Sequence, residues 1–335
     1  MRDAAEESQG AKALPNVRID ELNRETIRSY RMRYENRHEG HPWNDLPSSE
    51  FLRCIGAAAE TDDGTLHPTG AGLLMFGNDW RIHEEFPEYF LDYRQQISPA
   101  TRWQDRVVSQ GGDWSGNVYD FYYRIYNLMK QTLRLPFKLE EITRVDDTPA
   151  HRALREALAN CLTNANYHER RGVVCIWEEG AITIANPGDF RVDIERAKRG
   201  GESDPRNKNM MQIFSYIDVG ERAGSGLPKI FGGWRECGYA DPSYEEQFGP
   251  DRTILTLPLM PAGPITTQVT TQVEALLSAM GNGTYSTVEL MGELGLSSRK
   301  NFMENYLNPA LAADLVERTI PNKPNSRLQR YRRKA

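Results

Sequence analysis

Five polar side chains recur at every fourth position of one helical segment, and their types could do chemistry. They are Arg152, Glu156, Asn160, Asn164 and His168. A spacing of four places neighbours of such a series on one slanting stripe of a helix. Most other positions in the segment are small or apolar, and asparagine is a mediocre helix former that a solvated face rarely uses. The stripe therefore predicts that something polar meets this helix; an ordinary polar helix face is the alternative.

Glu156 and Asn160 together suit a specific reaction. A carboxylate orients or deprotonates a water molecule, and an amide oxygen one turn further on can ligate Mg²⁺, which prefers hard oxygen ligands and phosphate partners. The sequence has no Walker-type GxxxxGK[ST] loop, which disfavours a P-loop mechanism. The pair predicts magnesium-dependent chemistry on a phosphate by another route.

The element that carries this pair has a clear start. Thr148 followed by Pro149 is the signature of an N-cap and a first helical turn, and the pattern predicts a helix over residues 148–168. The alternation that follows predicts an α/β layer with at least one hairpin. Its expected elements are strands over 173–178, 182–185 and 252–257 and a helix from Gly226 to about Cys237.

These features resemble the GHKL ATPase superfamily, which includes gyrase and histidine kinases. REALANCLTNANYH looks like its Glu-x-x-x-Asn box, and IANPGDF (184–190) stands in the position of its Asp-x-Gly adenine box. GERAGSGLPKI (220–230) resembles the Gly-x-Gly box that opens a helix under the phosphates. The resemblance implies an α/β sandwich of the α+β type that binds ATP and Mg²⁺, turns over slowly and self-associates.

A closer resemblance is to bacterial ATP-binding proteins described as transcriptional regulators, with a divergent GHKL-type domain. The phrases LREALAN, RRGVV, IANPGDFR, GGESDPRN and DVGERAGSGLPKI carry it, and the likeness runs from about residue 20 to 335. Such proteins usually have a Schlafen-type, AlbA-like domain at the N-terminus, which we expect to be missing here.

The resemblance assigns roles to single positions. Glu156 would be the catalytic base and Asn160 the Mg²⁺ ligand. Backbone N–H groups at the start of a helix favour anions, so the Gly-x-Gly segment would face the phosphates. The implied cofactor-binding residues are Asn160, Asn164, Asn186, Gly188, Gly224, Ser225 and Gly226, with Arg206, Asn207, Arg222 and Lys229 on the lid or phosphate side.

Asn186 departs from the family pattern, because most GHKL proteins have Asp at the adenine-reading position. An amide can accept a hydrogen bond from the adenine amino group, but it can also donate one. The sequence therefore leaves base selectivity open. Pro187 stiffens the turn that follows, and a simple strand-ending turn is the alternative interpretation of this segment.

The remaining chain divides into further segments. We expect a linker remnant over 1–18, an α/β domain that packs with the ATPase domain over 19–146, the GHKL-like domain over 147–260, a linker over 261–272 and a winged helix over 273–335. Within 19–146 no catalytic constellation is evident. Helices are predicted there over 25–36, 49–57 and 117–133, and buried strands over Gly70–Phe76 and 89–93.

The C-terminal segment is basic. Residues 298–335 hold nine Lys/Arg against three acids and therefore carry a charge of +6. The first 297 residues carry −12, which gives the chain its net charge of −6. A basic module on an acidic body indicates a localised anionic partner. Three short helices and a strand pair around 321–326 resemble a winged helix, although many winged helices contact proteins instead. The DNA-binding candidates are Arg299, Lys300, Asn301, Lys323, Arg327 and Arg330.

Composition excludes several classes of protein. No apolar run reaches the roughly 18 residues of a membrane span, and the polar N-terminus is unlike a signal peptide. Four scattered cysteines indicate reduced thiols, so we expect a cytoplasmic protein. The leading hypothesis is an ATP-binding, DNA-associated transcriptional regulator. The alternatives are a nucleotide-binding scaffold or oligomerisation module without catalysis, and an ATPase coupled to nucleic-acid remodelling.

Overall fold

The computed structural model describes ten stretches of the chain in two compact units, Met1–Met260 and Pro261–Ala335. The described residues are 10–96, 104–133, 147–201, 204–220, 224–260, 271–281, 283–296, 298–312, 315–319 and 329–334. Both units mix helices and strands, which confirms the expected α/β (α+β) class. Across these residues no helix is both long and apolar enough to cross a membrane.

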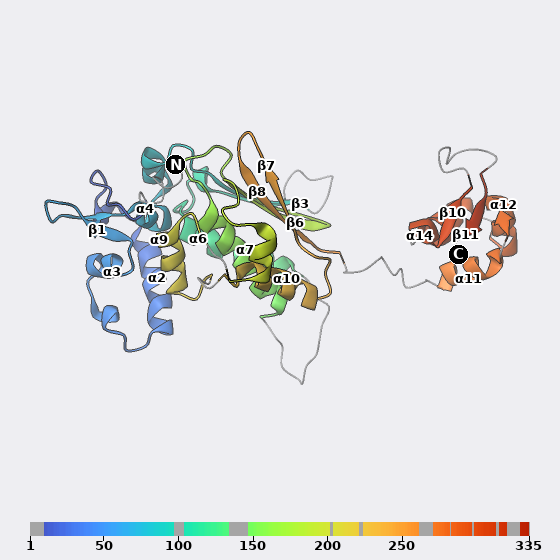
Figure 1. The fold of residues 1–335 in the computed structure, drawn as a ribbon, viewed down its shortest axis with the longest axis horizontal. Coiled ribbons are helices and arrows are strands. Elements are labelled where there is room, and N and C mark those ends of the chain that lie inside the picture. Colours follow the sequence, from blue (N-terminus) through green and yellow to red (C-terminus); the bar gives the residue numbers. More distant parts are fainter. Residues whose placement is uncertain are drawn as a thin grey trace. The chain divides into compact units, whose positions relative to one another are not determined.

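A six-stranded mixed sheet forms the centre of the first unit, in the order β4-β3-β5-β6-β8-β7 (Figure 1). β3 pairs in parallel with β5, and all other neighbours are antiparallel. The sheet therefore runs without a break across the boundary expected near residue 146. Its strands are β3 (Leu91–Gln96), β4 (Asp105–Val108), β5 (Val173–Glu178), β6 (Ala181–Pro187), β7 (Ser243–Gln247) and β8 (Arg252–Pro258).

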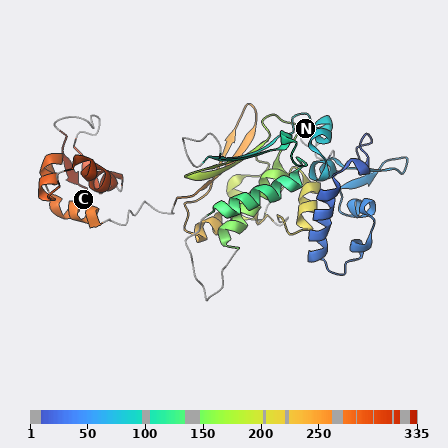
Figure 2. The same ribbon diagram turned by 180° about the vertical axis from the view of Figure 1, so that it is seen from behind.

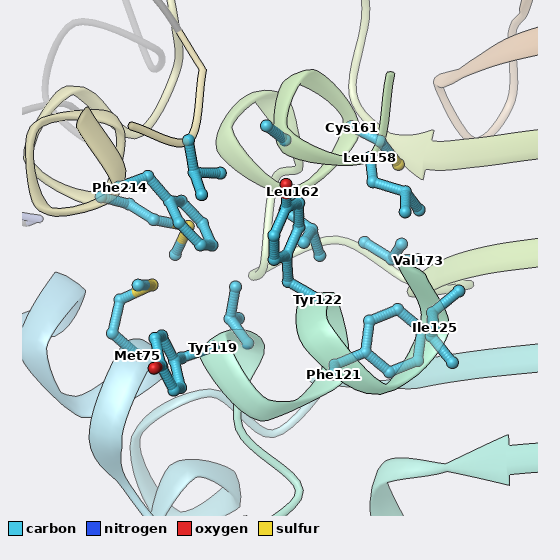
Figure 3. Close-up of a cluster of buried hydrophobic side chains, with 14 of the residues drawn as sticks. Met75, Tyr119, Phe121, Tyr122, Ile125, Leu158, Cys161, Leu162, Val173 and Phe214 are labelled. Carbon is cyan, nitrogen blue, oxygen red and sulfur yellow. The ribbon is translucent and has the colours of Figure 1, made fainter. Parts of the chain in front are cut away.

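Two long helices, α6 (Val118–Thr132) and α7 (Pro149–Asn164), lie along one face of this sheet in both ribbon views (Figure 1 and Figure 2). Asn117 starts α6 by accepting a hydrogen bond from the Asp120 N–H at 2.9 Å. Figure 3 shows part of the buried layer between the two helices and the sheet, where Val173 of β5 lies between Leu158 of α7 and the side chains of Phe121 and Ile125 of α6. Each such side chain contributes about 1.5–3 kcal/mol when it leaves water, so this layer fixes the position of α7.

The helices α8 (Ile194–Arg199), α9 (Lys208–Ser215) and α10 (Gly226–Glu236) complete the C-terminal half of the first unit. The Trp234 indole on α10 donates to the Pro258 carbonyl at 2.7 Å and is fully buried, which fastens α10 to the end of β8. The N-terminal elements are η1 (Ile19–Glu21), α2 (Arg24–Arg37), η2 (Pro42–Asp45), α3 (Ser48–Cys54), β1 (Ala58–Glu60), β2 (Leu66–Pro68), α4 (Gly70–Phe76), α5 (Asp79–Glu85) and η3 (Ser109–Gly111).

The strand predicted over Gly70–Phe76 is wrong, because these residues form the helix α4. All seven are buried, so the apolar run has no alternation that separates a strand from a helix. Thr69 decides the outcome locally, since its side chain accepts a hydrogen bond from the Gly72 N–H at 3.0 Å and caps the helix.

Two boundaries also differ from the sequence predictions. Residues 10–18, expected as part of a linker, pack onto the first unit: Val17 is fully buried and the Leu14 N–H donates to the Pro68 carbonyl at 2.8 Å. The helix predicted to reach His168 ends at Asn164, because the next residue, Ala165, turns to an extended conformation. His168 is therefore exposed in the following turn, where it packs on the Phe86 ring.

The second unit has its own core and a three-stranded antiparallel sheet in the order β10-β11-β9. A capping box starts the helix at Thr287, since Ser286 N–H donates to Glu289 Oε2 at 2.7 Å and Glu289 N–H donates back to Ser286 Oγ at 3.3 Å. Its elements are α11 (Thr271–Met280), β9 (Thr284–Tyr285), α12 (Thr287–Glu293), α13 (Arg299–Phe302), the π-helical η4 (Met303–Leu307), α14 (Asn308–Ala312), β10 (Val316–Arg318) and β11 (Tyr331–Arg333). The linker expected over 261–272 lies almost entirely outside the described residues.

Candidate functional site

The start of α10 rests directly on the Glu156/Asn160 stretch of α7. A side-chain carbon at Gly226 would lie 2.7 Å from both Glu156 Oε1 and Asn160 Nδ2. One at Gly233, two turns further along α10, would lie 2.6 Å from the Pro149 carbonyl oxygen. Only glycine fits at Gly233, where the near atom belongs to the backbone, whereas a methyl group at Gly226 would have to displace the ends of the Glu156 and Asn160 side chains. The two glycines therefore let the N-terminus of α10 lie against the two candidate side chains. Glu156 is buried there, with 7% of its surface exposed.

A cavity of about 80 Å³ lies beside this contact, between α7 and the strands β6 and β8. Several residues predicted from separate motifs line it, together with others the sequence did not single out. Ligand sites usually measure about 300–1,000 Å³, so this cavity is smaller than most sites for small molecules. The polar lining comes mainly from Asn160, Asn164, Asn186, Thr253 and Asp189, and Gly224, Gly226 and Leu227 cover one side.

Two buried polar side chains stand opposite each other on the sheet side of this cavity. Asn186 of β6 pairs with Thr253 of β8 in the strand register. Asn186 Nδ2 donates to the Pro187 carbonyl at 3.1 Å, and Thr253 Oγ1 donates to the Gly188 carbonyl at 2.9 Å. Each residue is only 6% exposed, so the orientation of both polar groups is fixed by the backbone of the IANPG turn.

Arg206 and Asn207, expected on the lid or phosphate side, both contact other parts of the first unit. Arg206 is 8% exposed and holds Asp189 Oδ1 at 2.7 Å, beneath the turn at Gly188. Asn207 Nδ2 donates to the carbonyls of Thr163 and Ala165 at 3.1 and 2.8 Å, and so satisfies the open C-terminal end of α7. These contacts hold the turn at Gly188 and the C-terminal end of α7 in position, and the phosphate-side role of both residues stays a prediction.

Glu156 lines a second and larger cavity of about 810 Å³, and it shares that cavity with Ser225 and Lys229. Gly226 and Asn160, in contrast, line the first cavity. The contact at Gly226 therefore lies between the two cavities. The first cavity is bordered by the sheet, and the second is lined in part by the exposed Arg152 and Lys229. Arg222 lies outside the described residues.

Arg155, next to Glu156, fastens the start of α7. Its guanidinium forms two hydrogen bonds with Asp147, at 2.7 and 3.0 Å, and a third with the Tyr126 hydroxyl at 3.1 Å. Burial alone would lower the pKa of Arg155, but the hydrogen bonds and charges of Asp147 and Tyr126 together outweigh it and raise that pKa. Arg155 is therefore a fixed positive charge that holds the residue before the N-cap in place.

Glu156 and Asn160 fit Mg²⁺ only as part of a site whose other ligands would be water and phosphate oxygens. Among the residues described, no group of three or more His, Cys, Asp or Glu side chains could hold a metal ion. Glu156 and Asn160 offer hard oxygen atoms one turn apart, at the place where Gly226 leaves no room for a side chain. Mg²⁺ commonly takes one or two protein ligands and completes its shell with water and phosphate oxygens, which matches this arrangement.

The sequence did not single out Thr253 and Cys161 as site residues. Thr253 was placed on the predicted strand 252–257, but only the strand register shows that it faces Asn186. Cys161 follows Asn160 and lines the first cavity, where burial raises the pKa of its thiol well above the ordinary value. No signal in a single sequence separates this cysteine from an ordinary core thiol.

The structure describes the side chains of only some of the DNA-binding candidates in the second unit. Arg299 and Asn301 are both exposed on α13, at the start of the helical run that η4 and α14 continue. Arg330 is engaged, since its Nη2 lies 2.8 Å from Glu289 Oε2 and donates to the Thr284 carbonyl at 3.2 Å. Lys323 and Arg327, like the side chain of Lys300, lie outside the described residues.

Comparison with known families covers three separate segments. Residues 177–256 match the family described as "Putative ATP-dependent DNA helicase recG C-terminal", an ATPase-like domain. Residues 271–333 match "Filamentation induced by cAMP protein Fic-like, C-terminal domain", and residues 1–92 match a domain of unknown function, DUF8451. The chain thus contains a segment similar to an ATPase-like domain, and this match starts after α7, so it does not include Glu156 or Asn160.

Two solved structures are similar to the chain to different degrees. The DIP2311 protein from Corynebacterium diphtheriae aligns over 97% of this chain with a TM-score of 0.58 and 13% identity, which shows a shared fold. This chain spans 64% of that protein's length. A Fic family protein from Desulfovibrio desulfuricans G20 is 29% identical over 39% of this chain and 34% of its own, but its TM-score of 0.20 carries no structural argument. No curated protein matches the chain.

Proposed function

We propose that the first unit binds ATP with Mg²⁺, in a GHKL-like manner, between α7 and the β6/β8 strands. The observation that carries this proposal is the meeting of three distant motifs at one cavity: Asn160 of α7, Asn186 of β6 and Gly226 of α10. The similarity of residues 177–256 to an ATPase-like domain supports it independently.

In this proposal the base enters the first cavity and the phosphates pass the start of α10. Asn160 supplies an oxygen to Mg²⁺, which neutralises phosphate charge, and the first N–H groups of α10 face the phosphate oxygens. Glu156 orients the attacking water from the second cavity, which it lines. Because the first cavity measures about 80 Å³, binding includes an outward movement of the segment around Gly224.

Isothermal titration of Mg-ATP into wild type and Asn160→Ala tests the binding site. We expect binding by the wild type and its loss in the variant. Ser298→Ala, in the second unit, serves as a control that leaves the cavity untouched. The proposal fails if the wild type shows neither binding heat nor a thermal shift with Mg-ATP, since a ligand of the native state must raise its stability.

Turnover separates a nucleotide hydrolase from a scaffold. Glu156→Gln keeps the shape of the side chain but removes the carboxylate, so we expect ATP to bind and phosphate release to fall at least about 100-fold. Equal phosphate release by the variant and the wild type would remove Glu156 from the reaction. If the wild type binds ATP without releasing phosphate, the nucleotide-binding scaffold is the better description.

We further propose that the second unit gives the protein a DNA-associated, regulatory role and that ATP alters self-association or DNA affinity. Its support is the charge of residues 298–335 and the strand pair β10/β11 next to three short helices, as in a winged helix. A fluorescence binding assay with duplex DNA at 50 and 200 mM salt, with and without Mg-ATP, tests this. A DNA affinity that changes neither with salt concentration nor on addition of Mg-ATP contradicts the proposal.

A further inference from the structure

The central sheet of the first unit has one face that points away from α6 and α7. Thr253 and Leu255 of β8 line the first cavity on the helix side, so the alternate residues of β8 and their register partners point the other way. Side chains of this open face are partly exposed on several strands, so it is accessible to solvent. Examples are Arg94, Ile176, Thr183, Arg252, Ile254 and Thr256.

Two arginines on the open face share one buried carboxylate. Arg94 of β3 and Arg106 of β4 are partners in the strand register, and Asp92 precedes Arg94 on the same face. Arg94 Nε and Arg106 Nε donate to the Asp92 carboxylate at 2.6 and 3.1 Å. Asp92 is fully buried, whereas the Arg106 side chain is 43% exposed. One negative charge therefore faces two positive charges.

Two further arginines stand where β5 and β8 begin. Both strands pair antiparallel with β6, so they run in one direction and start at the same end of the sheet. Arg171 lies two residues before β5, and Arg252 is the first residue of β8. Neither side chain forms a hydrogen bond or an ion pair with another of the described residues. Burial lowers the pKa of Arg252, and the nearby positive charges of Arg171 and Arg94 lower it further.

The backbone at Arg171 is in an unusual conformation. Its φ is +80°, in the left-handed region that residues with a side chain seldom adopt. A side-chain carbon at the next residue, Gly172, would lie 2.2 Å from the Phe90 carbonyl oxygen, so the turn passes directly beside the residue before β3. Strained residues of this kind are common at ligand-binding sites, where the surrounding structure fixes them.

These side chains form an arginine cluster, made of Arg94, Arg106, Arg171 and Arg252. Four positive charges against the one of Asp92 leave an excess of +3, on a segment of the chain whose first 297 residues carry −12. The exposed acids Glu178 and Glu245 also belong to the open face, but they lie at the far end of β5 and on the edge strand β7. A local excess of this sign attracts an anionic ligand.

The spread of the arginine cluster favours a chain of phosphates over a single one. Its members come from β4, β3 and the starts of β5 and β8, with β6 between the last two, so strands about 4.8 Å apart give a span of roughly 19 Å. Duplex DNA presents one negative charge about every 1.7 Å along its axis. Proteins that bind single strands stack the bases on aromatic side chains, and none of the described strand residues on the open face is aromatic.

We propose that the arginine cluster binds the phosphate backbone of duplex DNA. Guanidinium groups bond phosphate oxygens in pairs, and such contacts hold the duplex without selecting a sequence. The open face lies on the opposite side of the sheet from the first cavity. The proposal therefore depends neither on the nucleotide site nor on the DNA contact proposed for the second unit.

Anisotropy titration of a fluorescent duplex with the full chain, at about 50 and 200 mM salt, tests this proposal. The variant Arg171→Asn/Arg252→Gln removes two charges, and asparagine tolerates the left-handed backbone at position 171. We expect it to bind the duplex at least about 10-fold more weakly at the lower salt concentration, with a salt slope smaller by about two. Arg28→Gln/Arg53→Gln is the matched control, because it removes two exposed arginines of α2 and α3, outside the sheet.

An affinity and a salt slope equal to those of the wild type overturn the proposal, as does a wild type that does not bind duplex DNA. Tighter binding of a single strand, or displacement of the duplex by inorganic phosphate at an equal phosphate concentration, assigns the cluster to another anion and also refutes it. The variant should unfold at a urea midpoint no lower than that of the wild type, since it loses charges that repel each other. If the midpoint falls, Arg171→Asn alone decides, and wild-type affinity of that variant overturns the proposal.

Discussion

Replacing Gly226 or Gly233 by alanine separates the function of the α7–α10 contact from its stability. Both glycines face α7, and in both cases the added methyl group would come within 2.7 Å of an atom of that helix. The atoms differ in kind, however. At Gly226 they are the ends of the Glu156 and Asn160 side chains, and at Gly233 the nearest is the backbone oxygen of Pro149.

The size of each effect follows from what can move. A side-chain carbon normally stays at least about 3.4 Å from a neighbouring nitrogen or oxygen atom, so each methyl group intrudes by roughly 0.7–0.8 Å. Side-chain ends can rotate away, and alanine favours a helix by about 1 kcal/mol over glycine, so Gly226→Ala should change the free energy of unfolding by less than about 1 kcal/mol. The Pro149 backbone cannot yield in this way, and Gly233→Ala should lower that free energy by about 1–3 kcal/mol.

Urea unfolding and titration with Mg-ATP together check this pair. Gly226→Ala should unfold like the wild type but bind Mg-ATP at least about 10-fold more weakly, because Glu156 and Asn160 no longer hold their positions. Gly233→Ala should show the lower midpoint and, at temperatures where it is folded, binding close to the wild type. The reasoning is refuted if Gly226→Ala binds normally or if Gly233→Ala is as stable as the wild type.

Three further predictions concern the supports of the site and the second unit. Burial lowers the pKa of His151 below its ordinary 6.5, so the unfolded chain takes up this proton first as the pH falls. The wild type should therefore lose stability between about pH 7 and 5, and His151→Gln should lose less; equal slopes in urea unfolding at several pH values would contradict this. Asn207→Ala removes two donors from the end of α7 and should cost about 1–2 kcal/mol of unfolding free energy, so a variant with an unchanged urea midpoint would exclude the capping role. Arg330→Gln breaks an exposed ion pair and should cost less than about 1 kcal/mol, yet reduce the salt dependence of DNA binding by about one charge; an unchanged salt slope would place Arg330 away from the DNA.

Local signals in the sequence were sufficient for the helix that carries the candidate pair. Thr148 and Pro149 mark the start of α7 correctly, because capping depends only on neighbouring residues. The hairpin of β5 and β6 is confirmed for a similar reason, since a short turn joins two patterned runs. The same logic failed for Gly70–Phe76, where full burial leaves no polar position to show the period.

The parts of the site that could not be predicted depend on contacts between distant segments. Thr253 faces Asn186 only through the pairing of β6 with β8. Arg206 was expected on the lid or phosphate side, and only the structure shows that it pairs with Asp189 beneath the turn at Gly188. A charge in a sequence shows that a partner is needed, and the fold decides which partner it is. The roles proposed for Glu156 and the other site residues stay predictions.

The order of strands in the sheet sets the time at which the first unit can fold during synthesis. β6 lies near the middle of the sheet, and its residue Ala181 pairs with Pro258 of β8, which is synthesised much later. β5 likewise needs β3, which is made much earlier in the chain, as its parallel neighbour. Pairings between such distant segments slow folding, because a long loop must close before the contact forms. On the ribosome, the candidate site should therefore assemble in one late step, once the chain as far as β8 has emerged.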